Sequence, residues 1–86
     1  MFSLAHFDIE LLLRRYGIAK ESALRNKQLA DFYATQPGEE ERVEFHTLLA
    51  QDVSEDAQIF WSTLYEIKLE AYITNNMEVV DLLKTI

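Results

Sequence analysis

The sequence predicts an all-α protein, a small irregular or orthogonal bundle of four to five helices in a single domain over residues 1–86. Three observations support this prediction. Only two glycines and one proline interrupt a chain rich in helix-forming residues, no long stretch alternates polar and apolar residues, and 49% of the residues are hydrophobic. We therefore expect a compact helical core built without disulfides or metals.

The first two helices are predicted around residues 4–16 and 20–35. The first carries one apolar face at helical spacing, made of Ile9, Leu12, Leu13 and Tyr16. Gly17 fits the left-handed position just past a helix end, and Ile18 can fold back onto the preceding turn. The second helix is expected to end before Pro37, because the residue before a proline disfavours the α region.

Helix-breaking and helix-capping residues after residue 36 predict where the remaining helices begin and end. A third helix is expected to begin at Pro37 or Gly38, and the segment 52–54 is expected to break it, with Ser54 as the N-cap of the next helix. The fourth helix, about residues 55–74, is the longest, and a last one follows from Met77 to Thr85. The core residues we predict are Trp61, Leu64, Phe60, Ile67, Leu12, Tyr16, Phe32, Phe45 and Leu48.

Charge and cysteine content restrict the cellular setting. The chain has no cysteine and a net charge of −7, with residues 1–30 carrying +2 and residues 31–86 carrying −9. The lack of cysteine argues against a small secreted domain, so we expect a cytoplasmic protein. The start of the chain lacks a basic signal-peptide region, and the longest apolar run, residues 11–13, is too short to span a bilayer.

Residues 9–28 resemble a helix-turn-helix. Gly17 stands at the ninth position of the motif, Ile18 follows it, and the second helix would open with polar residues. Leu13 and Asn26 depart from the pattern, which favours a small and an apolar residue at these positions. The resemblance implies a DNA-binding regulator. Its candidate nucleic-acid contacts are Lys20, Ser22, Arg25 and Lys27.

Two clusters of acidic residues are candidate partner-binding sites. The members are Glu39, Glu40, Glu41 and Glu44 in the first cluster and Asp52, Glu55 and Asp56 in the second. They could dock a basic surface of another protein. The alternative is that both clusters lie at helix starts, where the helix dipole favours negative charge.

Surplus apolar residues are the second candidate binding feature. Six of them fall outside the main core stripes of the first and fourth helices, namely Leu4, Phe7, Leu11, Ile59, Leu69 and Ile73. Exposed, they would form an apolar interface, which could serve homodimerisation through the first or fourth helix. Alternatively, the fourth helix is enclosed on all sides by its neighbours and buries them.

The sequence offers no catalytic constellation. The pairs His6/Glu10 and Glu66/Glu70 are one helical turn apart, but a metal site needs more ligands and acid–base catalysis needs a buried pocket. We therefore expect no enzyme, no metal, no cofactor and no membrane contact. The function predicted is a protein-binding regulator, inhibitor or adaptor, comparable in profile to phage- or plasmid-type inhibitors, with DNA binding as the alternative.

Overall fold

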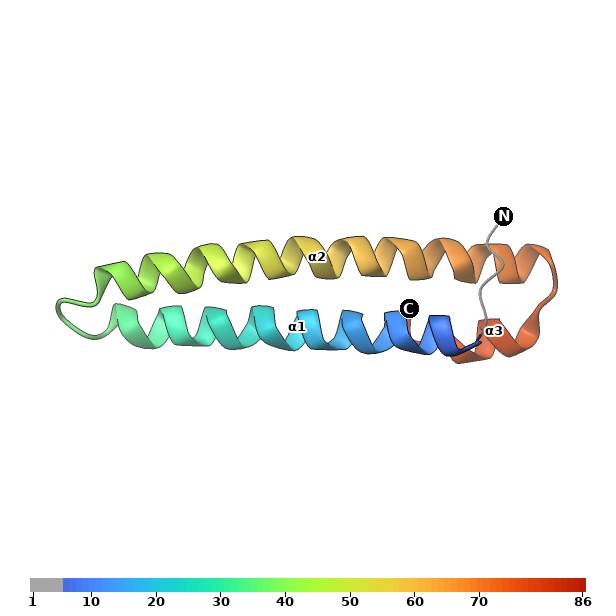
Figure 1. Ribbon diagram of the computed structural model, residues 1–86, viewed down its shortest axis with the longest axis horizontal. Coiled ribbons are helices and arrows are strands. Elements are labelled where there is room, and N and C mark those ends of the chain that lie inside the picture. The colour runs from blue at the N-terminus through green and yellow to red at the C-terminus, as the bar shows by residue number, and fades with distance from the viewer. Residues whose placement is uncertain (1–5) are drawn as a thin grey trace.

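A computed structural model describes the backbone of residues 6–86 and the side chains from residue 8 onward. This part of the chain forms three helices, α1 (His6–Ala34), α2 (Glu40–Ile73) and α3 (Met77–Leu82). α1 and α2 run antiparallel side by side as a long hairpin, and α3 folds back at the end opposite the hairpin tip (Figure 1). The all-α prediction is confirmed, but the bundle of four to five helices is wrong, because two long helices form nearly the whole molecule.

The molecule is a rod that measures 57 × 18 × 18 Å. Its radius of gyration is 17.0 Å, whereas a compact chain of this length would have one of about 12 Å. The difference arises because the two expected breaks at Gly17 and at residues 52–54 do not form. Both segments lie inside continuous helices of 29 and 34 residues.

The only expected break that forms between the long helices is the one at residues 35–39. There the amides of Thr35 and Gln36 donate to carbonyls of the last turn of α1, and Gly38 takes the left-handed conformation at φ 81°. α2 then begins at Glu40, slightly later than expected. Proline and a left-handed glycine together stop a helix, whereas Gly17 alone or Ser54 alone does not.

A seam of residues spaced alternately three and four apart joins α1 to α2. This is the spacing of an antiparallel coiled coil, which keeps one narrow stripe of each helix facing the other. The α1 members are Ile9, Leu12, Tyr16, Ala19, Ala23, Asn26, Ala30 and Tyr33, and the α2 members are Val43, His46, Ala50, Val53, Ala57, Phe60, Leu64, Ile67 and Ala71. All of them are buried or half-buried. Because the middle of the seam is rich in alanine, it buries little side-chain area.

The largest buried cluster lies at the base of the hairpin, where α3 packs against both long helices. Its fully buried members Ile9, Leu64 and Leu83 come one from α1, one from α2 and one from the residue that follows α3. The side chain of Asn76 caps α3 by accepting from the amide of Val79 at 3.4 Å. Lys68 of α2 donates to the backbone carbonyl of Ile86 at 2.8 Å, which ties down the end of the chain.

The predicted core is correct only at this base. Leu64 and Ile67 are buried, and Leu12, Tyr16 and Phe60 are half-buried. The other four predicted core residues are wrong, because a straight two-helix seam leaves them outside it. These exposed residues are Trp61, Phe32, Phe45 and Leu48.

Candidate partner-binding surfaces

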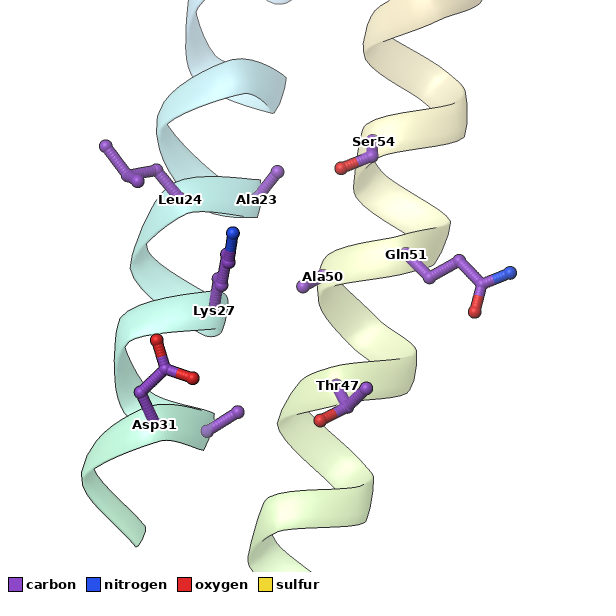
Figure 2. Close-up of a pocket in the computed structure, with 9 residues that line it drawn as sticks. Ala23, Leu24, Lys27, Asp31, Thr47, Ala50, Gln51 and Ser54 are labelled. Atoms are coloured by element: carbon purple, nitrogen blue, oxygen red, sulfur yellow. The ribbon is translucent and has the colours of Figure 1, made fainter. Parts of the chain in front are cut away.

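The hairpin has two long flanks, one on each side of the seam, and one of them is grooved. Residues that directly follow seam positions, such as Lys27 after Asn26 and Ser54 after Val53, line a groove of about 430 Å³. Figure 2 shows Ala23 and Ala50 pointing into the gap between the helices from opposite sides. The full lining comprises Ala23, Leu24, Lys27, Ala30, Asp31, Thr47, Ala50, Gln51 and Ser54.

The opposite flank carries large apolar side chains from both helices, interspersed with charged ones. Residues that directly precede seam positions point there, for example Leu29 before Ala30 and Leu49 before Ala50. Residues three or four positions apart lie on the same side of an α-helix, so the residues at this spacing from Leu29 and Leu49 point to the same flank. We define the apolar flank as Leu11, Ile18, Leu29 and Phe32 of α1 with Phe45, Leu49 and Ile59 of α2. Ile18, Phe45 and Ile59 are 60%, 60% and 64% exposed.

A third apolar surface runs along α2 alone. Trp61, Tyr65, Leu69 and Tyr72 follow one another at intervals of four, four and three residues, which places them on one face of the helix. All four are exposed, and the rings of Trp61 and Tyr65 stack at a centroid distance of 5.0 Å. We call these four residues the aromatic stripe. The sequence does not reveal this surface, because its apolar spacing predicts Trp61 in the core.

The apolar residues predicted as an interface have different surroundings. Leu4 and Phe7 lie outside the described side chains, and Leu11 is half-buried on the apolar flank. Ile59, Leu69 and Ile73 are exposed, so the alternative in which neighbouring helices enclose them is wrong. Their role as an interface stays a prediction.

The acidic clusters occupy different environments. Glu40 and Glu41 lie in the first turn of α2, where the helix dipole accounts for them, and Glu39 pairs with Arg42 at 3.2 Å. Glu44 is exposed one turn further along. Asp52, Glu55 and Asp56 are exposed in the middle of α2, far from a helix start. The helix-dipole explanation therefore fails for the second cluster.

The turn of the expected helix-turn-helix does not form. α1 runs straight through Gly17 and Ile18, so residues 9–28 form a single helix. On this helix Lys20 and Lys27 point to the grooved flank, whereas Ser22 and Arg25 point to the apolar flank. The four candidate nucleic-acid contacts therefore do not share one face, as a recognition helix in a major groove requires.

A polar contact within the seam lies near the hairpin tip. Asn26 is only 8% exposed, and its Nδ2 donates to the carbonyl of Ser22 at 2.9 Å. Its Oδ1 therefore faces Nδ1 of His46, also at 2.9 Å, and this nitrogen carries the donated proton. The His46 ring stacks on the Tyr33 ring at a centroid distance of 5.6 Å. The Arg42 guanidinium lies over the same Tyr33 ring, 5.3 Å from its centroid. In the sequence, Asn26 is recognisable only as a departure from the helix-turn-helix pattern.

Within residues 6–86, no group of three or more His, Cys, Asp or Glu side chains is arranged to hold a metal ion. None of the three helices contains an apolar stretch of a length that could cross a membrane. Comparison of the chain with protein families, curated proteins and solved structures gives no match.

Proposed function

We propose that this chain is a non-enzymatic, cytoplasmic regulator, inhibitor or adaptor that binds another protein through exposed apolar side chains and acidic residues of α2. The observation that carries the proposal is the number of large apolar side chains on the surface. Twelve of them are at least 38% exposed among the described residues. Contiguous apolar patches on soluble proteins mark interaction sites, because exposing them to water is unfavourable.

The aromatic stripe is the part of this surface best suited to anchor a partner. Tryptophan and tyrosine are enriched among the residues that dominate binding energy, because each buries a large area with little loss of side-chain entropy. The Trp61–Tyr65 stack holds two such rings in place before binding. The free protein therefore presents a partly ordered anchor to its partner.

Acidic residues supply the electrostatic part of the proposal. Glu40, Glu41 and Glu44 are exposed near the hairpin tip. A partner with a basic surface would be steered toward this end and would associate more slowly in high salt.

The proposal is tested by affinity capture from native lysate with nuclease treatment, followed by mass spectrometry. The variant Trp61→Ala/Tyr65→Ala should lose at least about tenfold of the captured protein relative to the wild type, because truncating anchor residues weakens binding most. The matched control is Gln51→Ala/Gln58→Ala, which changes two exposed polar residues of α2. Circular dichroism should show equal helix content in all three proteins.

Two results would contradict the proposal. Capture that disappears with nuclease would indicate nucleic-acid binding and would direct attention to Lys20, Arg25 and Lys27. Equal capture by the wild type, the stripe variant and the control would exclude the aromatic stripe as the anchor.

A further inference from the structure

We propose that the apolar flank binds a second copy of this chain, giving a two-fold symmetric four-helix bundle in which both hairpin tips lie at the same end. In this arrangement α1 of each copy packs against α2 of the other. The aromatic stripe does not take part, so it stays available for the partner proposed above, although the dimer would cover Ile18, Phe32, Phe45 and Ile59 among the twelve exposed apolar side chains.

The exposed area of the single chain matches what such a dimer requires. A compact folded chain of this mass exposes about 5,300 Å², whereas this chain exposes 6402 Å². The excess of about 1,100 Å² compares with the roughly 800 Å² that each partner buries in an interface of standard size. A flank that runs along the rod, 57 Å long and 18 Å wide, offers an area of this order.

The exposed apolar residues that α1 and α2 contribute to the flank lie at matching levels along the rod, which is compatible with a two-fold axis parallel to it. In the hairpin, His46 is hydrogen-bonded to Asn26 and stacked on Tyr33, so it lies between the levels of these two α1 residues, and Phe32 therefore lies near the level of Phe45. By the same register, Ile18 lies near the level of Ile59. A two-fold axis parallel to the rod preserves these levels and brings α1 of one copy against α2 of the other. Ile18 and Phe32, the exposed apolar residues that α1 contributes to the flank, then lie near Ile59 and Phe45 of the second copy.

The charged residues near the middle of the flank favour this arrangement over the inverted one. The charged residues near the middle of the flank are Arg15 and Arg25 on α1 and Asp52 and Asp56 on α2. With the tips together, the arginines of one copy approach the aspartates of the other. In the end-to-end inverted dimer, Arg15 would meet Arg25 of the second copy, and Asp52 would meet Asp56, so like charges would face each other.

Arg15 and Arg25 are also available for such a contact. Neither arginine forms an ion pair with another described residue of its own chain. Both are exposed. Pairing across the interface would therefore add contacts without breaking existing ones.

The first experiment measures the molar mass in solution by sedimentation equilibrium over a dilution series. The wild type should be a dimer that dissociates on dilution, and Ile18→Asp/Ile59→Asp should weaken it at least about tenfold, since each charge would be buried unpaired. Both residues are largely exposed in the single chain, so the fold should survive. The matched control, Leu24→Asp/Leu69→Asp, changes exposed residues outside the flank and should leave the mass unchanged.

The second experiment tests the charged contacts of the flank by charge exchange and the arrangement by a distance measurement. Arg15→Glu/Arg25→Glu and Asp52→Lys/Asp56→Lys should each be monomeric alone, because like charges then face each other at both halves of the interface. Mixed in equal amounts, the two variants should form a heterodimer. Spin labels on the single variant Gln36→Cys, in a chain otherwise free of cysteine, should lie about 10 to 20 Å apart across the dimer.

Four results would overturn the proposal. A wild type that remains monomeric throughout would exclude the dimer, and dissociation caused by the control variant alone would place the contact elsewhere. Failure of the two charge variants to associate would exclude these four charged residues from the interface. A spin-label distance near the 57 Å rod length would show the inverted arrangement.

Discussion

Asn26 and His46 are two polar residues in a seam whose other side chains are mostly small or apolar. A buried polar group is stable only when its hydrogen-bonding atoms have partners, and Asn26 finds them in the carbonyl of Ser22 and the ring of His46. A shift of one helix along the other would separate these atoms and leave the amide unpaired. The contact therefore favours one register over others in which alanines could also meet alanines.

Asn26→Ala should lower the free energy of unfolding by about 1 to 2 kcal/mol, because it removes the partner of a half-buried ring nitrogen. The effect is measured by urea denaturation followed by circular dichroism at a protein concentration below that of dimer formation. His46→Ala and the double variant complete the cycle. A coupling energy near zero between the two sites would show that the 2.9 Å contact does not contribute to stability.

Gly17 lies inside α1, although its local sequence predicts a helix end there. A glycine after an apolar run is a common helix end, yet α1 continues through it for another four turns. Interrupting α1 there would remove the seam contacts of Ala19, Ala23 and Ala30 with α2. Their combined burial outweighs the roughly 1 kcal/mol by which glycine disfavours a helix relative to alanine.

Gly17→Ala should therefore stabilise the protein by about 0.5 to 1 kcal/mol, because the position is helical and no atom lies within 4 Å of the added Cβ. Gly38→Ala is the contrasting variant. It should destabilise by about 1 kcal/mol or more, since Gly38 adopts φ 81° at the hairpin tip. Thermal unfolding of both variants checks the pair, and a destabilised Gly17→Ala would show that α1 ends at this glycine.

At the scale of the whole molecule, the core is concentrated at one end of the rod. The base buries Ile9, Leu64 and Leu83 completely, whereas the central seam depends on alanines and the tip exposes Phe32 and Phe45. Hydrophobic stabilisation follows buried area, so the base contributes most to holding the single chain together. A second copy on the apolar flank would extend that burial to the tip.

Leu83→Ala should lower the free energy of unfolding by about 2 to 4 kcal/mol, because it opens a cavity in a fully buried cluster contributed by all three helical segments. The control Leu24→Ala changes an exposed leucine on the grooved flank and should stay within about 0.5 kcal/mol of the wild type. Urea denaturation compares the two. Equal losses would show that α3 does not anchor the hairpin.

The sequence by itself determined the helical class, the turn at Pro37 and Gly38, and part of the core at the base. Helix propensity and a proline followed by glycine act locally, so their effects can be read from neighbouring residues. Leu64 and Ile67 were also predictable, because they lie on the apolar face of a long amphipathic segment. The surplus of apolar residues on the fourth predicted helix was visible in the same way.

The tertiary structure alone decided the length of the helices and the side on which each apolar residue lies. Gly17 and Ser54 are compatible with both a break and a continuous helix, and the energy of the long seam selects the continuous form. Once α1 and α2 are straight, Trp61, Phe32, Phe45 and Leu48 lie outside the seam instead of in a core. Packing partners distant in sequence therefore determined which surfaces remain available for binding.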